Sequence, residues 1–328
     1  MPESPLLIVR RLAVRYPQPR LFPWRARHWR NVVDGLDFNL HAGETLGLVG
    51  ESGCGKSSLA KALIGLQPIA SGAAIFNGVD LAKLDKKRWK PLRRDIQMVF
   101  QDPLASLDPR MKVGRIVEQP LVALRPDIDK ADRPQHVAAV LERVGLSAGD
   151  MQRHVHEFSG GQCQRIGLAR ALVVQPKLLI CDEPVSALDV SVQAQVVNLL
   201  AELQRDLGLA MLFIAHDLAV VRQLAQRVLV MYSGTVLEQA PRERLFTQPM
   251  HPYTQALMAA VPGSNALVAD TAARDMEQHP PSGSQGMTLG CRYRDRCIVA
   301  DDYCGRTVPA LRRTAPDHFA ACHFIAAA

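Results

Sequence analysis

The sequence has no long hydrophobic run. Its best apolar stretches, around Leu178–Cys181 and Val228–Met231, are only as long as β-strands, whereas a helix that spans a membrane needs about 20 apolar residues. The N-terminus also lacks the basic region followed by an apolar region that marks a secretory signal. These absences exclude an integral membrane protein with helical spans, and we expect a protein of the cytosol.

Internal repeats are also absent, and only one glycine-rich loop of the phosphate-binding type occurs, which argues against two nucleotide domains in tandem. The chain nevertheless has 328 residues, 48% of them hydrophobic, enough for a sizeable core and for about two domains, or one α/β domain with an appendage. The net charge is +7, and seven arginines without an acid lie between Arg10 and Arg30. Such a run, interleaved with aromatic residues, could bind nucleic acid or anionic lipid; a solvated basic face is the simpler interpretation.

Residues 50–57 read Gly-Glu-Ser-Gly-Cys-Gly-Lys-Ser, a complete GxxxxGK[ST] phosphate loop. A short apolar run, Thr45–Val49, precedes it, and a helix-like stretch, Ser57–Leu66, follows it. Glycines let backbone N–H groups turn toward phosphates, and the helix N-terminus adds its positive end. Lys56 can reach the β- and γ-phosphates, and the hydroxyl group of Ser57 suits Mg²⁺. The motif therefore predicts a nucleotide-binding site.

Two acids end the apolar run that starts at Leu178. Asp182 can hold Mg²⁺ together with Ser57, and Glu183 can take a proton from an attacking water. Acids at the carboxyl end of a strand are placed where α/β folds present catalytic groups. A second glycine-containing segment, Phe158–Gln162, precedes a helix-like stretch. Alone it is a helix cap, but a serine and two glycines at a helix N-terminus also suit an anion.

Six motifs follow one another in the order found in the ATP-binding cassette (ABC) family of ATPases, which the chain therefore resembles. They are the phosphate loop, Gln101 after an apolar strand, Ser-Gly-Gly-Gln at 159–162, the strand with Asp182 and Glu183, Ser-Ala-Leu-Asp at 186–189, and His216 after another strand. The sequence departs mildly from the family pattern, because Phe158 stands where leucine is usual.

The resemblance implies a role for each motif. Tyr16 would stack on adenine, although a plain strand aromatic is the alternative. Gln101 would coordinate Mg²⁺ or position water and couple to a membrane partner. His216 would contact the γ-phosphate, and Asp189 would lie at a dimer interface. The expected site residues are Glu183, His216 and Gln101 for catalysis; Tyr16, Gly50, Ser52, Gly53, Cys54, Gly55, Lys56, Ser57, Ser58, Gln101 and Asp182 for ATP and Mg²⁺; and Ser159, Gly160, Gly161 and Gln162, the signature that touches the ATP of an opposing subunit.

A narrower resemblance, to the ATPase subunits of bacterial dipeptide and oligopeptide importers, rests on residues 101–110, 182–191, 251–257 and 290–297. It implies an ATPase that energises peptide import from the cytoplasmic face of the bacterial inner membrane. The implied partners are a second ABC ATPase subunit (a paralogue or a second copy), two membrane permease subunits and, indirectly, a peptide-binding protein outside the membrane. No nucleic acid is expected. One alternative is a soluble ABC ATPase that acts on nucleic acid or ribosomes. Another is a non-enzymatic nucleotide sensor, which the presence of Lys56, Asp182, Glu183 and His216 disfavours.

Four of the seven cysteines crowd the C-terminal end: Cys291, Cys297, Cys304 and Cys322. In a reducing cytosol such a group indicates a metal or cluster site rather than disulfides. Four thiolates can hold Zn²⁺ or a [4Fe–4S] cluster, and free thiols are the third possibility. Members of the peptide-importer family can carry an iron–sulfur cluster, so the resemblance favours [4Fe–4S]. His318 and His323 are possible substitute ligands or supporting groups.

Alternating strand and helix patterns predict an α/β fold. The resemblance makes it a phosphate-loop NTPase core of the RecA type with an antiparallel β subdomain and a helical subdomain, plus a small Cys-rich C-terminal extension. Strand-like runs are expected at 6–14, 32–40, 45–49, 95–100, 177–181, 210–214, 227–231 and 235–238. The expected nucleotide-binding domain covers residues 1–245, with the helical subdomain at about 102–158. The extension covers 246–328, beginning with a short helix and a polar linker.

Overall fold

The computed structural model describes residues 4–18, 28–260 and 289–325. The chain forms two compact units, each assembled from several stretches of sequence. The first contains residues 4–7, 40–45 and 76–214, and the second contains residues 8–39, 46–75 and the described residues from 215 onward. Each unit is described by itself.

Three parallel strands form the sheet of the first unit, in the order β8 (Ala210–Ala215), β7 (Leu178–Asp182) and β6 (Ile96–Val99). Every residue of β7 and β8 is buried, as expected for parallel strands with both faces covered. Val99 pairs with Cys181, and Asp182 pairs with Ile214. The residues that follow β6 and β7 therefore leave the sheet at the same edge.

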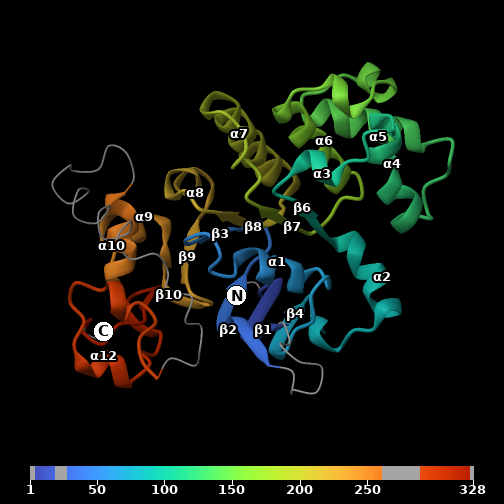
Figure 1. Ribbon diagram of the computed structural model, residues 1–328. Coiled ribbons are helices and arrows are strands. Elements are labelled where there is room, and N and C mark those ends of the chain that lie inside the picture. Colours follow the sequence, from blue (N-terminus) through green and yellow to red (C-terminus); the bar gives the residue numbers. More distant parts are fainter. Residues whose placement is uncertain (1–3, 19–27, 261–288, 326–328) are drawn as a thin grey trace. The chain divides into compact units, whose positions relative to one another are not determined.

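The helical part of the first unit is built around three helices that pack against one another: α4 (Val113–Leu124), α5 (Arg133–Arg143) and α6 (Gly160–Leu172) (Figure 1). The buried apolar residues of α4 recur at helical spacing, Val113, Ile116, Val117 and Leu121, which puts them on one face. The remaining elements of this unit are β5 (Val79–Asp80), η1 (Leu81–Lys83), α2 (Lys86–Asp95), α3 (Pro103–Ser106), η2 (Ala148–Gln152), η3 (Val155–Glu157) and α7 (Val190–Leu207).

The second unit contains strands of two sheets. One has the order β2 (Trp29–Leu40), β1 (Leu7–Pro17), β4 (Ser71–Phe76), and the other has the order β11 (Arg312–Ala315), β12 (His318–Ala320), β10 (Thr235–Pro241), β9 (Arg227–Tyr232), β3 (Thr45–Val49). Strands β3 and β9 are parallel, whereas the β9–β10, β10–β12 and β11–β12 pairs are antiparallel. The helices of this unit are α1 (Lys56–Leu63), α8 (Leu218–Leu224), α9 (Arg242–Thr247), α10 (Pro252–Ala259), η4 (Arg294–Arg296) and α12 (Asp302–Arg306).

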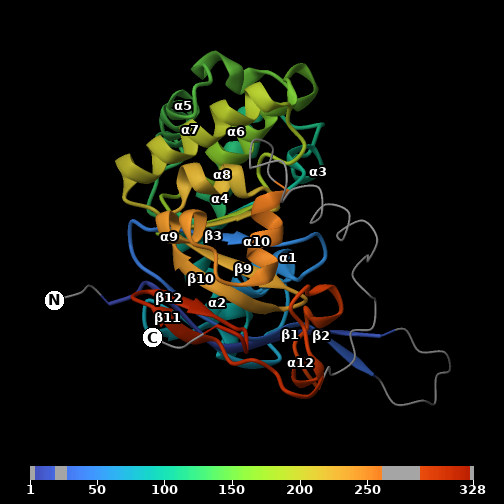
Figure 2. The ribbon, with the colours of Figure 1, turned by 90° about the vertical axis from the view of Figure 1, so that its left-hand side faces the viewer.

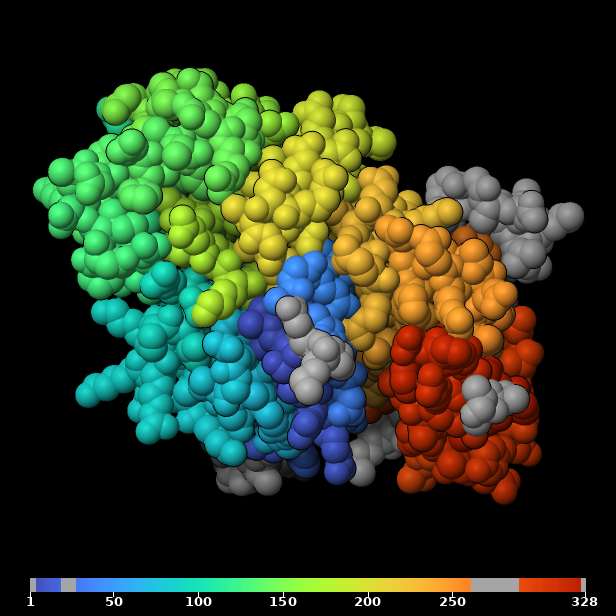
Figure 3. Space-filling view, turned by 180° about the vertical axis from the view of Figure 1, so that it is seen from behind, coloured from blue at the N-terminus to red at the C-terminus, as the bar shows by residue number. Residues whose placement is uncertain are grey.

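The C-terminal residues are part of this sheet. Glu238 pairs with Ala320 and Gln239 pairs with Phe319, so that β12 continues the sheet beyond β10 (Figure 2). The space-filling view shows the C-terminal segment in red lying directly against the orange α9–α10 segment (Figure 3). Residues from the far end of the sequence therefore complete the edge of a sheet that begins at β3.

The expected strands are all found, with ends that differ by a few residues. Sequence analysis missed β4, β5, β11 and β12. For β11 the burial pattern explains why: its residues are exposed or half-buried along its whole length, so it has no apolar alternation to detect. Helices α3, α4 and α5 lie in the expected helical region at 102–158. The expected linker falls largely on residues 261–288, outside the described residues.

Candidate functional site

The phosphate loop leaves the buried strand β3 and enters α1. Three of its glycines have positive φ: Gly50 (155°), Gly53 (78°) and Gly55 (111°). A Cβ atom on Gly50 would lie 2.1 Å from the Met231 carbonyl oxygen, and one on Gly55 would lie 2.5 Å from the Val32 carbonyl oxygen. A Cβ on Gly53 would meet nothing within 4 Å. Two glycines therefore let neighbouring backbone come close, and the third shapes an open turn.

Lys56 begins α1 and is 4% exposed. Its Nζ donates to the carbonyl oxygens of Gly50 (2.7 Å) and Glu51 (3.0 Å). The first turn of α1 carries no acid. Ser52 and Gly53 are exposed, and Ser57 and Ser58 are half-buried. This arrangement fits a nucleotide phosphate, because an ammonium group, a helix N-terminus and an open glycine turn are collected within one short segment.

Two other expected site residues belong to the same unit. Tyr16 lies on β1 and is half-buried. His216 is exposed and directly follows β8. The next residue, Asp217, caps α8 by accepting a hydrogen bond from the Ala219 N–H (2.7 Å). Cys54 of the loop is buried, and burial raises the pKa of its thiol.

In the first unit, Gln101 and Glu183 lie at the carboxyl ends of the adjacent parallel strands β6 and β7. The Gln101 Nε2 donates to Glu183 Oε2 at 3.2 Å. Asp182, one residue earlier, is the last residue of β7 and only 3% exposed. The structure thus brings together the three expected residues Gln101, Asp182 and Glu183, which suit a metal ion and a proton acceptor.

Glu183 has a backbone φ of 46°, an uncommon conformation for a residue other than glycine. Its N–H donates to the Ile214 carbonyl of β8 (3.0 Å), and its carbonyl accepts from the Ser186 hydroxyl group (3.0 Å). These contacts hold the residue in the left-handed conformation. Backbone strain of this kind persists only where surrounding contacts impose it.

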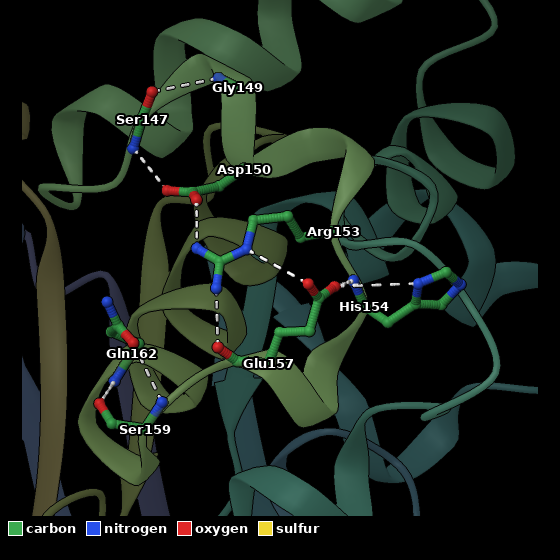
Figure 4. Close-up of polar contacts among 8 residues, drawn as sticks. All are labelled: Ser147, Gly149, Asp150, Arg153, His154, Glu157, Ser159 and Gln162. Atoms are coloured by element: carbon green, nitrogen blue, oxygen red, sulfur yellow. Dashed lines mark hydrogen bonds and ion pairs between the residues drawn. The ribbon is translucent and has the colours of Figure 1, made fainter.

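The signature segment forms a helix cap of two reciprocal bonds. The Gln162 N–H donates to the Ser159 hydroxyl group (3.3 Å), and the Ser159 N–H donates to Gln162 Oε1 (3.0 Å) (Figure 4). This capping box satisfies two of the free donors at the start of α6. Ser159, Gly160 and Gln162 are exposed, whereas Gly161 is buried.

Arg153 makes several contacts with residues that precede the signature. Its Nη1 donates to Asp150 Oδ1 (2.9 Å) and its Nη2 to the Glu157 carbonyl oxygen (2.8 Å) (Figure 4). The guanidinium group also lies 4.3 Å from the centroid of the Phe158 ring, a cation–π contact. The cation–π contact gives a structural reason for phenylalanine at position 158, where leucine is usual, because a leucine side chain could not make this contact with Arg153.

Gly161 sets how closely the signature helix approaches α7. A Cβ on Gly161 would lie 2.3 Å from Val192 Cγ1 of α7. Asp189 caps α7: it accepts from the Ser191 hydroxyl group (2.7 Å) and the Val192 N–H (3.0 Å). The Ser191 hydrogen bond is the main cause that lowers the pKa of the Asp189 carboxyl. Asp189 is thus fixed at the N-terminus of α7, and the absence of a side chain at Gly161 lets the signature helix approach this same end of α7.

The four C-terminal cysteines are gathered in the last part of the second unit. The Cys291 N–H donates to the Cys304 carbonyl oxygen (2.7 Å). The pKa of the Cys291 thiol is raised to about 11, mainly by burial and to a smaller extent by the three other cysteines of the group. Within the described ranges 4–18, 28–260 and 289–325, no three His, Cys, Asp or Glu side chains are arranged to hold a metal ion. His318 Nε2 instead contacts Glu238 Oε1 (2.6 Å), and His323 Nε2 contacts the Thr307 carbonyl (2.9 Å).

Comparison with known proteins places these features in one family. Residues 33–186 match the family model described as ABC transporter, and residues 237–304 match that described as oligopeptide/dipeptide transporter, C-terminal region. An oligopeptide transport ATP-binding protein of Haemophilus influenzae is 49% identical over 290 residues, covering 88% of this chain and 87% of that protein. The chain belongs to the ABC transporter ATPase family. The corresponding protein of Escherichia coli is also 49% identical (88% and 86% covered), and a putative peptide import ATP-binding protein of Brucella ovis is 45% identical (98% of each).

Solved structures agree with this ABC ATPase assignment. A subunit of an ABC transporter complex from Clostridium perfringens is 28% identical, with a TM-score of 0.65 over 75% of this chain and 92% of that one. A dimeric ATP-binding cassette bound to ADP and Pi is 24% identical, with a TM-score of 0.64 over 72% and 98%. The predicted ABC ATPase fold is confirmed. Among the described helices of this ABC ATPase, none is long and apolar enough to cross a membrane.

Sequence analysis missed a set of contacts that tie the C-terminal residues to the rest of the second unit. Arg296 pairs with Glu51 of the phosphate loop (2.8 Å), and Arg292 pairs with Asp34 of β2. Glu238 is fully buried. Partners separated by 245 and 258 residues leave no local pattern. The only available signal was the placement of two acids, Glu51 and Glu238, within otherwise buried or glycine-rich segments.

Proposed function

We propose that this ABC ATPase uses ATP to drive the import of oligopeptides or dipeptides through a membrane permease. The observation that carries this proposal is the match of residues 237–304 to the C-terminal region of oligopeptide and dipeptide transporters, in addition to the cassette match at 33–186. The relatives that match over most of their length have names of peptide transport and peptide import proteins.

The proposed chemistry uses residues at the carboxyl ends of β6 and β7 together with Ser57 of α1. When Mg²⁺ and ATP are bound, Ser57, Asp182 and Gln101 would hold the metal ion, which neutralises phosphate charge. Glu183 would accept the proton of the attacking water. The Gln101 amide, 3.2 Å from the Glu183 carboxylate, orients that carboxylate and keeps one of its oxygens occupied. Support for the base role comes from the strained backbone that fixes Glu183 at the strand end.

The proposed assembly joins this chain to a second ABC ATPase subunit, either a paralogue or another copy, so that each signature faces the ATP of the other subunit. The exposed signature serine and Asp189 support it, as does the neighbouring Val190, whose exposed fraction is 84%. Two permease subunits and a peptide-binding protein outside the membrane complete the proposed importer. The ATPase would then lie on the cytoplasmic face of the membrane, held there by the permease.

Transport in vesicles tests this proposal. The ATPase, its partner and the permease subunits are reconstituted, and uptake of a labelled oligopeptide is followed with and without ATP. Glu183→Gln should bind ATP but lose at least about a hundredfold in hydrolysis, the range of a general base. Glu202→Gln, an exposed glutamate of α7, is the matched control and should transport normally. ATP hydrolysis without any peptide-dependent stimulation or uptake would refute peptide import, and normal turnover in Glu183→Gln would remove Glu183 from its role.

We also propose that Cys291, Cys297, Cys304 and Cys322 hold a [4Fe–4S] cluster. Their sequence spacing and their shared position in the second unit support this proposal, although the described side chains are not arranged as a metal site. Protein purified without oxygen should be brown and contain acid-labile sulfide. Cys291→Ser should lose both properties, whereas Cys163→Ser, a buried cysteine on α6, should keep them. A colourless preparation without iron would contradict the cluster.

A further inference from the structure

The phosphate loop of this protein contains an acid, Glu51, between Gly50 and Ser52. Lys56 donates to the backbone oxygen of this same residue (3.0 Å), so Glu51 lies within the part of the loop that the lysine holds. A carboxylate in a loop that binds phosphates is unfavourable, because like charges repel strongly where water is partly excluded. A cation close to the Glu51 carboxylate would offset this repulsion.

Arg296 supplies that cation from the other end of the sequence. Its Nη1 lies 2.8 Å from Glu51 Oε2. The Arg296 side chain is 5% exposed and the Glu51 side chain 19% exposed, so water and salt screen the pair only weakly. The guanidinium group also lies 5.9 Å from the centroid of the Tyr232 ring, which helps to fix its position.

The backbone of Glu51 is held by a second residue. The Glu51 N–H donates to the Tyr253 hydroxyl oxygen (3.0 Å). Tyr253 is fully buried, and its ring packs against those of Tyr232 and Tyr293, with centroids 4.8 Å and 5.2 Å away. The backbone of the loop at Glu51 is therefore hydrogen-bonded to a residue of an aromatic cluster. The Glu51 carboxylate is paired separately with Arg296.

The second carboxylate oxygen of Glu51 lacks a compensating partner in the described part of the chain. Glu51 Oε1 is buried and has no hydrogen-bond partner among the described residues. The carboxylate therefore depends on Arg296 for its neutralisation. Without that guanidinium group, a charged and poorly solvated carboxylate would remain beside the phosphate-binding loop.

We propose that Arg296 is a positioning residue for nucleotide binding: it neutralises Glu51 and holds it away from the path of the ATP phosphates, so that the C-terminal segment sets the affinity of the phosphate loop. This inference rests on the ATP binding of the family and on no aspect of peptide transport. Arg296 acts through Glu51 and has no chemical step of its own.

Equilibrium binding of a fluorescent ATP analogue to the full chain tests the proposal, with four variants: Arg296→Gln, Arg296→Lys, Glu51→Gln, and the double variant Glu51→Gln/Arg296→Gln. Arg296→Gln should weaken binding about tenfold, since it leaves one like charge near the phosphates. Glu51→Gln and Arg296→Lys should stay within about threefold of the native Kd. The double variant should recover most of the lost affinity. Arg306→Gln, which removes an exposed arginine from the same segment, is the matched control and should bind as the native chain does.

Salt provides a second readout that a purely structural role would not change. The loss in Arg296→Gln should shrink between about 0.05 M and 0.5 M salt, because added ions can screen a carboxylate that the guanidinium group no longer covers, whereas the double variant should show no such dependence. Native affinity in Arg296→Gln, or a double variant as weak as Arg296→Gln, would overturn the proposal. If Arg296→Gln does not fold, the double variant decides: a folded, nucleotide-binding protein supports the proposal, and an unfolded one overturns it. The native Kd, measured first, tests the ATPase assignment separately.

Discussion

Replacing Glu238 with alanine should destabilise this protein strongly. Glu238 lies on β10 and is fully buried. Its carboxylate accepts hydrogen bonds from the N–H groups of Met250 (2.8 Å) and His251 (2.9 Å), and its Oε1 lies 2.6 Å from His318 Nε2 of β12. One side chain thus joins a strand, the turn before α10 and the C-terminal strand.

The expected magnitude follows from those three contacts. Glu238→Ala leaves one buried backbone donor, one part-buried backbone donor and one imidazole ring without their acceptor, and each unsatisfied group costs about 1–3 kcal/mol. Breaking a buried pair by removing one partner costs about 3–5 kcal/mol in comparable cases. We therefore expect the free energy of unfolding to fall by about 3–5 kcal/mol. His318→Ala should cost less, because the two backbone donors keep their acceptor.

Urea unfolding followed by circular dichroism measures this effect, and a double-mutant cycle isolates the pair. The Glu238–His318 coupling should be about 1–3 kcal/mol. Glu243→Ala, which removes an exposed carboxylate on α9 paired with Arg242, is the control and should change stability by less than about 1 kcal/mol. A loss below about 1 kcal/mol in Glu238→Ala, or strict additivity in the cycle, would show that the buried contacts do not hold this edge.

Two further predictions concern the signature and a buried histidine. Gly161→Ala should lower the free energy of unfolding, measured by thermal unfolding, by about 1–3 kcal/mol, because the new Cβ would lie 2.3 Å from Val192 Cγ1. Adding Val192→Ala should recover the lost stability. A double variant as unstable as Gly161→Ala would argue against the clash. Burial lowers the pKa of His251 to about 4, and its Nδ1 accepts from the Tyr253 N–H (3.0 Å). His251 of the unfolded chain, with its higher pKa, is protonated before His251 of the folded chain as the pH falls. The contribution of neutral His251 to the free energy of unfolding should therefore be complete above pH 6.5 and should fall by roughly 3 kcal/mol as the pH drops toward 4. In His251→Asn this part of the pH dependence should vanish.

The parts that sequence analysis predicted well are those that depend on local pattern. An apolar run followed by a polar residue placed Gln101 and Glu183 at strand ends, and the parallel pairing of β6 with β7 then brought them within 3.2 Å. The phosphate loop was found for the same reason, since its glycines, lysine and serine are contiguous in sequence.

The parts it could not predict depend on pairs that are distant in sequence. Nothing local indicates that Glu51 pairs with Arg296 or that Glu238 is buried, because an isolated acid is more often exposed. Strand β11 was missed because its side chains are exposed or half-buried, so that pairing with β12, and not apolar burial, defines it. Whether the four C-terminal thiols hold a cluster is a question of side-chain placement, which spacing alone does not decide.

The pairing of Glu238 with His318 also has a consequence for synthesis of the protein on the ribosome. His318 follows Glu238 by 80 residues, which take about 4–16 s to translate at 5–20 residues per second. During that interval the nascent chain holds a carboxylate whose buried partner does not yet exist. We therefore expect β12 to pair with β10 only after the C-terminal strand has left the ribosome. The residues that are synthesised last would then complete the sheet that contains β3, the strand before the phosphate loop.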